Sequence, residues 1–281
     1  MSGITVEEAF EHCRRRARQH YENFPVGLFV PKDKQPYVHA LYAFARAADD
    51  FADEPRYEGM RVEKLDQWEA RLHAAYEGRA EDPIFIALAE TVRTLDIPKS
   101  LLLDLLSAFR QDTVKTRYDS WEEVLDYCRR SADPVGRLVL LIFEHRDPAL
   151  PPLSDAICTG LQLVNFLQDP PRDLALGRVY LPQNDLARFG VQDDDLAGPL
   201  TDEVAALLRF EGDRARSLLE AGLPLGKALP GRAGMSVALY ARGGLAALDA
   251  LERAGWDVFT GRPAPTRWTL ARLAALELFR R

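Results

Sequence analysis

Apolar side chains recur at helical spacing along nearly the whole chain. The pattern is clear in EKLDQWEARLHAAY, KSLLLDLLSAFRQD, LSDAICTGLQLVNFL and DEVAALLRFEGDRARSLLEAG, where apolar residues return every three or four positions. Strict alternation of apolar and polar residues, which would predict β-strands, is nearly absent. We therefore expect an all-α protein.

Helix starts and helix breaks are marked along the chain. Thr5 with Glu8 and Ser120 with Glu123 have the spacing of a capping box, and Thr201 is placed to cap the helix after it. Segments such as PKDKQP, RDPALPPLSD and GLPLGKALPGRAG separate about ten helical stretches by short joints. We expect a single helical domain over residues 1–281 with one core.

Composition excludes several classes of protein. The net charge of −7 argues against non-specific binding of nucleic acid, which needs a basic surface. The cysteines Cys13, Cys128 and Cys158 are too few and too scattered for a disulfide framework or a four-thiolate zinc site, and indicate a reduced, cytoplasmic protein. The sequence contains no run of about 18 apolar residues, so we expect no membrane-spanning helix.

The stretch ARAADDFADE places four acids directly after an apolar run. In a helix, Asp49 and Asp53 lie on one face, and Asp50 and Glu54 form a second pair rotated by one residue. Turned inward, such carboxylates would need a cation, because a buried anion without a partner is costly. Turned outward, they would be an ordinary solvated face.

A second cluster lies in LVNFLQDPPRD. Asn165, Asp169 and Asp173 follow at four-residue steps, but two prolines come directly after Asp169 and cannot continue a helix unchanged. We expect one helix to end near Gln168, with Asp169 at a joint and Pro170 at the first position of the next turn.

Two acidic faces set in apolar helices suit Mg²⁺, which takes one or two carboxylates and accepts the oxygens of a substrate diphosphate. A helical partner-binding module whose acids face solvent is the non-catalytic alternative. A carboxylate-bridged di-iron bundle is disfavoured, because none of the five histidines has a glutamate three residues before it. The charge runs CRRRARQ and QDDDLAG are interpreted as solvated surface or loop.

Longer motifs add to this interpretation. The stretches HYENF, YAFARAADDFADE, RYDSWEEVLDYCRRSADPVGRLVL, GLQLVNFLQDPPRDLALGRVYLP and LDALERAGWDVFTGR run nearly from end to end of the chain. Together they resemble the squalene and phytoene synthase family. The resemblance implies the all-α isoprenoid synthase fold, a single helical domain around a central cavity.

The resemblance also implies roles for particular residues. The Mg²⁺ ligands would be Asp49, Asp53, Asp169 and Asp173, with Asn165 beside them. The other implied site residues are His20, Arg46, Tyr42 and Arg262 around the diphosphate, Tyr127 and Gln162 near the reacting carbons, and Phe24, Phe44, Phe51 and Phe166 as pocket walls. Alternatively, Arg46 merely pairs with Asp49 or Asp50, and the aromatic residues are ordinary core.

Within the family the motifs are most similar to the bacterial hydroxysqualene synthase branch. This implies conversion of presqualene diphosphate to hydroxysqualene, with Mg²⁺ as cofactor, in squalene and hopanoid biosynthesis. The expected partners are the prenyl diphosphate substrate and the enzymes that make presqualene diphosphate and reduce hydroxysqualene. Peripheral contact with the inner membrane fits a hydrocarbon product. The alternatives within the family are presqualene diphosphate synthase and a phytoene or dehydrosqualene synthase.

Some positions depart from the family pattern. Pro170 stands where an aliphatic residue is expected, which bears on the pose of Asp169. SADPVG, with Asp133, replaces the usual small residues of this motif, and Gly244 stands where several relatives carry tyrosine, with Tyr240 one turn away. The last two departures are expected to reshape the hydrocarbon end of the pocket.

Overall fold

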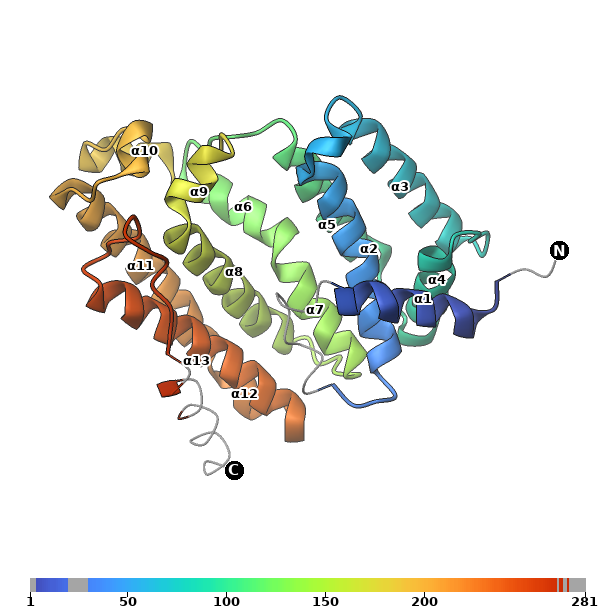
Figure 1. The fold of residues 1–281 in the computed structure, drawn as a ribbon. Helices are drawn as coiled ribbons and strands as arrows, with labels where there is room; N and C mark the ends of the chain where they lie inside the picture. Colours follow the sequence, from blue (N-terminus) through green and yellow to red (C-terminus); the bar gives the residue numbers. More distant parts are fainter. Residues whose placement is uncertain (1–3, 20–29, 267, 270–271, 273–281) are drawn as a thin grey trace. The chain divides into compact units, whose positions relative to one another are not determined.

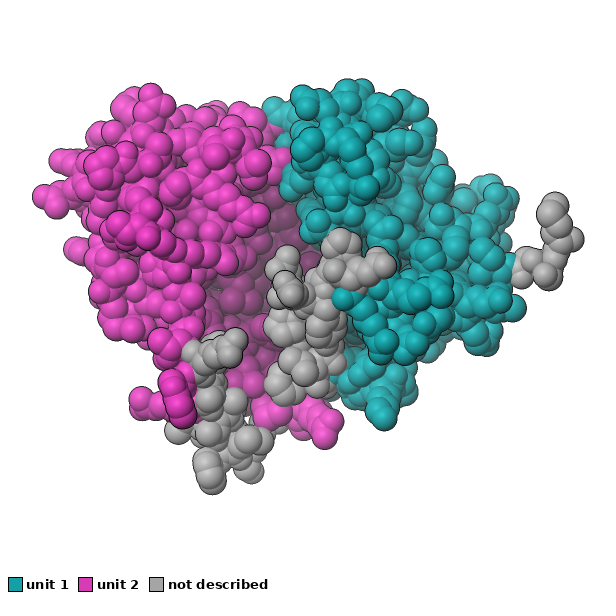
Figure 2. Space-filling view, in the orientation of Figure 1, with its two compact units in different colours: residues 1–114, 137–146 teal, residues 115–136, 147–281 magenta. Residues whose placement is uncertain are grey.

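The computed structural model describes residues 4–19, 30–266, 268–269 and 272. Over these residues the chain is helical and contains no β-strand, which confirms the all-α prediction (Figure 1). The chain divides into two compact units, coloured separately in Figure 2: residues 1–114 with 137–146, and residues 115–136 with 147–281. The single domain over residues 1–281 stays a prediction.

The first unit holds the N-terminal helices. They are α1 (Val6–Gln19), α2 (Gln35–Asp53), the short 3₁₀ turn η3 (Pro55–Tyr57), α3 (Arg61–Tyr76), α4 (Pro83–Leu95) and α5 (Lys99–Asp112). One of the boundaries between the units falls within α7 (Asp133–Ile142). None of these described helices, nor any in the second unit, is long and apolar enough to cross a membrane.

The second unit is built around two long helices. Its elements are α6 (Trp121–Ser131), α8 (Leu150–Gln168), α9 (Pro170–Ala175), α10 (Gln183–Phe189), η4 (Asp193–Ala197), α11 (Asp202–Gly222), α12 (Pro224–Ala228) and α13 (Gly231–Arg253). The described residues thus form thirteen α-helices rather than about ten. The short helices α9, α10 and α12 account for the difference, because five to seven residues leave no clear periodic pattern.

Two of the three predicted helix starts have the expected geometry. Thr5 and Glu8 exchange both hydrogen bonds of a capping box, and the Thr201 hydroxyl accepts the backbone N–H of Val204 at 3.2 Å. Ser120 caps α6, but the Glu123 carboxylate accepts the backbone N–H of Asp119. Glu123 also binds a lysine from the loop before α6, which draws its side chain away from the box.

The core of the first unit is formed where α2 meets its neighbours. α2 turns a row of alanines with Phe44 inward, and this apolar face packs against α1 and α4. Phe44 is fully buried and stacks on Trp68 of α3, whose indole N–H donates to the Phe44 carbonyl at 3.3 Å. Phe44 is thus a core residue of this unit. The polar face of α2 is left for the first acidic cluster.

In the second unit, glycines at the contacts between α8, α11 and α13 leave room for bulky side chains of the neighbouring helices, so these helices pack closely. A Cβ added to Gly160 of α8 would lie 2.8 Å from the buried Leu219 of α11. A Cβ added to Gly244 of α13 would meet both Leu161 and Leu219 at under 3.0 Å. Gly244 therefore lets α13 approach α8 and α11. The side chains of Leu161 and Leu219 occupy the space beside it.

Candidate active site

The first acidic cluster lies on α2. Tyr42, Arg46, Asp49 and Asp53 follow at steps of three and four residues and share one helical face. Asp53 is exposed and Asp49 is half-buried, whereas Asp50 beside them is only 3% exposed. The unequal burial means that the four acids of this stretch cannot share one role.

The buried Asp50 is neutralised by two arginines. Arg46 Nε lies 2.7 Å from Asp50 Oδ1, and its Nη1 lies 3.0 Å from Asp49 Oδ2. Arg16, on α1, donates from Nη2 to Asp50 Oδ2 at 3.2 Å. Arg46 thus pairs with both Asp49 and Asp50, which is the alternative to a direct role at the diphosphate. The interpretation of CRRRARQ as solvated surface is wrong for Arg16, because α1 packs against α2 and brings that side chain to the acids.

Tyr42 lies in the field of the same charges. Burial raises the pKa of its phenol, Arg46 and Arg16 oppose the shift, and Asp50 and Asp49 add to it. The hydroxyl of Tyr42 therefore keeps its proton at neutral pH.

The second acidic cluster forms where α8 ends and α9 begins, as predicted. Asp169 follows the last residue of α8, and Pro170 occupies the first position of α9. The Asp169 N–H donates to the Asn165 carbonyl at 3.1 Å, and the Asp173 N–H donates to the Asp169 carbonyl at 2.9 Å. The four-residue hydrogen-bond step thus continues through the joint, since proline at a helix start removes only an N–H that needs no partner.

Arg262 binds directly to this joint. Its Nε lies 2.8 Å from Asp169 Oδ1, and its Nη2 lies 3.0 Å from Oδ2. Next to this pair, the side-chain amide of Gln168 donates to the Pro263 carbonyl at 2.5 Å. These contacts fasten the segment after α13 to the end of α8 and place a guanidinium among the acids.

Asp173 is a half-buried carboxylate next to a second carboxylate, that of Asp169. Burial, and then the neighbouring Asp169 carboxylate, raise its pKa to about 7, although Arg172, Arg178 and Arg262 oppose the shift. A cation close to both carboxylates would favour the charged form of Asp173 and lower its pKa. The backbone N–H of Arg178 donates to the Asp173 carbonyl at 2.8 Å, which holds the GRVYLP segment beside the acids.

Four aromatic rings gather beside α8. Phe166 and Tyr180 stack with centroids 4.1 Å apart and an interplanar angle of 4°. Tyr127 lies 5.6 Å from Tyr180 and 6.2 Å from Phe166, and the buried Tyr118 contacts both tyrosines. Phe166 comes three residues before Asp169, so the aromatic cluster begins one turn from the acidic joint.

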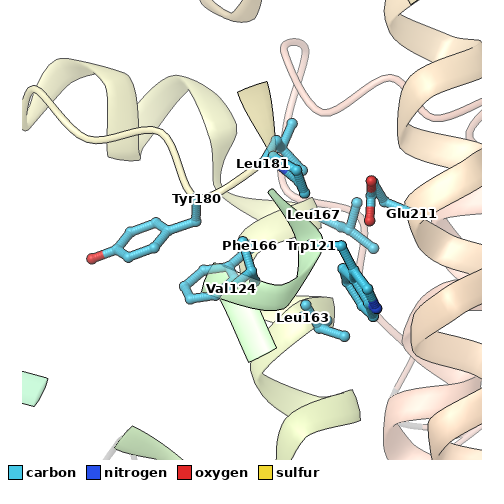
Figure 3. A pocket seen from close by; sticks show the side chains of 9 residues that line it. Trp121, Val124, Leu163, Phe166, Leu167, Tyr180, Leu181 and Glu211 are labelled. Carbon is cyan, nitrogen blue, oxygen red and sulfur yellow. The ribbon is translucent and has the colours of Figure 1, made fainter. Parts of the chain in front are cut away.

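A small pocket is lined in part by the stacked rings of Phe166 and Tyr180 (Figure 3). Its lining is Trp121, Val124, Leu163, Phe166, Leu167, Tyr180, Leu181, Pro182 and Glu211. The Tyr180 hydroxyl points away from the Glu211 side of the pocket (Figure 3). Glu211 is buried, and its carboxylate shares Arg214 Nη1 with Asp185, at 2.8 and 2.6 Å. Burial raises the pKa of Glu211 to about 7.

The segment with Tyr180 is held in place by main-chain contacts. Val179 and Gln183 donate their N–H groups to the carbonyls of Thr116 and Tyr118, at 2.9 and 2.8 Å. Arg117 reaches the Gly177 carbonyl at 2.7 Å. Tyr180 thus stands on a fixed segment that follows the second acidic cluster.

Other sequence-predicted residues fall in different places. Gln162 is half-buried on α8, four residues before Phe166 and on the same side. Phe51 packs edge-on against Tyr57 and Trp68 in the first unit. His20 and Phe24 lie outside the described residues. The family departure at Asp133 has a packing role, because its buried carboxylate accepts the Thr159 hydroxyl at 2.8 Å.

Sequence reasoning missed Arg16, Tyr180 and Glu211. Tyr180 is the aromatic residue of GRVYLP, the segment after the second acidic motif, and that position is the available signal. Arg16 and Glu211 lie in charged helical stretches without a distinguishing pattern. Their partners, Asp50 and Asp185, come from other helices, so only the packed structure brings each pair together.

The donor chemistry of both clusters fits Mg²⁺. Within the described residues no group of three or more histidine, cysteine, aspartate or glutamate side chains forms a ready metal cage. Each cluster instead offers two carboxylates beside arginines. Magnesium is usually bound by one or two carboxylates, several waters and substrate phosphate oxygens, so this sparse oxygen set suits it.

Residues 16–269 match the family model described as squalene/phytoene synthase. The chain belongs to this family. Its members are enzymes of isoprenoid biosynthesis that act on prenyl diphosphates, and the squalene/phytoene synthase fold seen here is the all-α isoprenoid synthase fold.

Three relatives within the squalene/phytoene synthase family illustrate the range of similarity. The crystal structure of squalene synthase HpnC from Alicyclobacillus acidocaldarius is 45% identical with a TM-score of 0.85, covering 90% of this chain and 97% of that one. Hydroxysqualene synthase of Rhodopseudomonas palustris is 41% identical over 73% of this chain and 70% of its own. 15-cis-Phytoene synthase of Synechocystis is 33% identical over 77% and 68%.

Proposed function

We propose that the protein converts presqualene diphosphate to hydroxysqualene with Mg²⁺. One observation carries the proposal: an acidic joint that holds an arginine lies one helical turn from a cluster of stacked aromatic rings. The joint suits a charged diphosphate head and the rings suit a hydrocarbon cation. The similarity to hydroxysqualene synthase of Rhodopseudomonas palustris, at 41% identity, supports this branch over the phytoene synthases, with 33% for the Synechocystis enzyme.

The reaction begins with heterolysis of a carbon–oxygen bond, in which the electron pair leaves with the diphosphate. Bound at Asp49, Asp53, Asp169 and Asp173, Mg²⁺ would supply positive charge for the leaving oxygens. The chain's own part is to orient and neutralise the diphosphate. Arg46 and Arg262 suit this task, because the planar guanidinium donates two parallel hydrogen bonds to an anion.

The cation left on carbon is a cyclopropylcarbinyl cation, which rearranges and joins the two prenyl halves head to head. Tyr180 and Phe166 stabilise positive charge through the electron-rich faces of their rings. The buried aromatic side chains also exclude bulk water, so one water captures the rearranged cation to form the alcohol. The proton released by that water passes to the departed diphosphate, either directly or relayed through the hydroxyl of Tyr127 or Tyr42.

The test is product analysis with purified protein, presqualene diphosphate and Mg²⁺, without a nicotinamide. We expect hydroxysqualene. Turnover of farnesyl or geranylgeranyl diphosphate alone would instead assign the chain to presqualene diphosphate, phytoene or dehydrosqualene synthases. A non-catalytic helical binding module would bind neither Mg²⁺ nor a prenyl diphosphate analogue in calorimetry.

The proposed reaction places the protein between two others. One must supply presqualene diphosphate, and the other must reduce hydroxysqualene to squalene. Because substrate and product carry long hydrocarbon chains, we also propose peripheral contact with the inner membrane from the cytoplasmic side. Sedimentation with liposomes, compared between substrate-free and substrate-loaded protein, measures that contact.

A further inference from the structure

We infer that Arg16 is a further anion-binding residue of the first acidic cluster, brought there by the buried carboxylate of Asp50. The inference rests on the proposed function, because it assigns Arg16 to the same diphosphate. Arg16 belongs to α1, whereas the rest of the cluster lies on α2. Neither helix alone therefore contains the complete set of cations.

Asp50 gathers two guanidinium groups. Arg16 approaches Oδ2 at 3.2 Å, and Arg46 approaches Oδ1 at 2.7 Å. Because the two oxygens belong to one carboxylate, the two guanidinium groups are neighbours. Two like charges are stable this close together only because the anion between them offsets their repulsion. The side chain of Asp50 is 4% exposed, so it is shielded from solvent and its contacts are with the two arginines.

Both guanidinium groups keep donors for another acceptor. Arg16 and Arg46 have side chains that are 30% and 32% exposed, so each presents part of its charge to solvent. Arg16 uses Nη2 for Asp50, and its buried Nε has no hydrogen-bond acceptor among the described residues. A guanidinium has five N–H donors, and a diphosphate oxygen is a suitable acceptor for those that remain.

The two arginines lower the negative charge that an approaching anion would meet at this place. Arg16 and Arg46 together offset the charges of Asp49 and Asp50. Arg16 acts on Tyr42 in the same direction as Arg46, which places both guanidinium groups within electrostatic reach of one phenol. Arg16 and Arg46 thus both present guanidinium donors beside the acids.

The test measures binding of inorganic pyrophosphate with Mg²⁺ to the full chain by calorimetry. Arg16→Gln is expected to weaken binding about tenfold or more, because it removes a charge-assisted hydrogen bond. Arg15→Gln is the matched control: it removes the same charge from an exposed position of the same helix and should change affinity less than about twofold. Equal affinities of the two variants would overturn the inference.

A second substitution keeps the test decisive if Arg16→Gln fails to fold. Arg16→Lys retains the ion pair with Asp50 but loses the planar fork, so we expect an affinity between those of the wild type and Arg16→Gln. Wild-type affinity in a folded Arg16→Lys, together with a lowered unfolding temperature, would reduce Arg16 to a structural partner of Asp50. If the wild-type protein binds no pyrophosphate, the proposed function fails together with the inference.

Discussion

Arg262 and Asp169 are joined by two parallel contacts, Nε to Oδ1 at 2.8 Å and Nη2 to Oδ2 at 3.0 Å. The pair links the segment after α13 to the end of α8, and Gln168 adds a second link through the Pro263 carbonyl. The acidic joint is therefore neutralised in part by its own chain.

Arg262→Lys should loosen this link. Lysine keeps the charge but cannot make both contacts, and half of the Arg262 side chain is exposed, so we expect a loss of about 0.5–1 kcal/mol in the free energy of unfolding. Hydrogen exchange over residues 257–266 should become faster. Arg253→Lys at the end of α13 is the control; an equal change in both variants would argue against a specific link.

Asp173→Asn should abolish Mg²⁺-dependent pyrophosphate binding while leaving the fold intact. Burial and Asp169 already disfavour its charged form, so the neutral amide should not lower the unfolding temperature at pH 8. Binding is measured by calorimetry and folding by circular dichroism. Asp213→Asn, at an exposed position of α11, should bind as the wild type does. Unimpaired binding by the Asp173 variant would remove it from the metal site.

Tyr180→Leu should lower kcat about tenfold with little change in KM, because a ring facing a carbocation contributes about 1–2 kcal/mol that leucine lacks. Tyr180→Phe retains the ring that stacks on Phe166 and should keep most of the activity. Steady-state kinetics with presqualene diphosphate measure both. A Phe variant as slow as the Leu variant would shift the role from the ring to the hydroxyl.

Glu211 should make stability depend on pH. Its pKa is raised from 4.5 to about 7, so the folded state holds the proton more tightly than the unfolded state. The stabilisation is complete below pH 4.5 and is lost as the pH rises through about 7.

Urea unfolding of the wild type and Glu211→Gln from pH 5 to pH 8 measures this contribution. The variant cannot ionise at this position and should lose less stability over the range. Asp173 contributes a similar slope in both proteins, so the difference between them isolates Glu211. Identical slopes would exclude a raised pKa for Glu211.

Two adjacent glycines of α13 should respond to alanine in opposite directions. A Cβ at Gly244 would meet leucine side chains at under 3.0 Å, so Gly244→Ala should destabilise the fold by about 1–3 kcal/mol. A Cβ at Gly243 meets nothing within 4 Å, so Gly243→Ala should stabilise it by about 0.5–1 kcal/mol through helix propensity. Thermal unfolding checks both, and a stabilised Gly244→Ala would mean that the leucines move aside freely.

The sequence by itself determined the helical class and the break between α8 and α9. Both follow from local chemistry: apolar spacing selects the helix, and Pro170 has no N–H to continue it. The four-residue spacing also placed Asp49 and Asp53 on one face of α2, because residues at that separation are neighbours on a helix. Family membership added the candidate ligands without showing their burial.

Only the tertiary structure decided which acid of α2 is buried and which cation meets it. Helical spacing puts Asp49 and Asp50 on adjoining faces, but the neighbouring helix that covers one face comes from 34 residues earlier in the chain. The same holds for Tyr180, whose partners Phe166, Tyr127 and Tyr118 come from other segments. Packing between distant segments sets burial and charge pairing, and no local pattern encodes either.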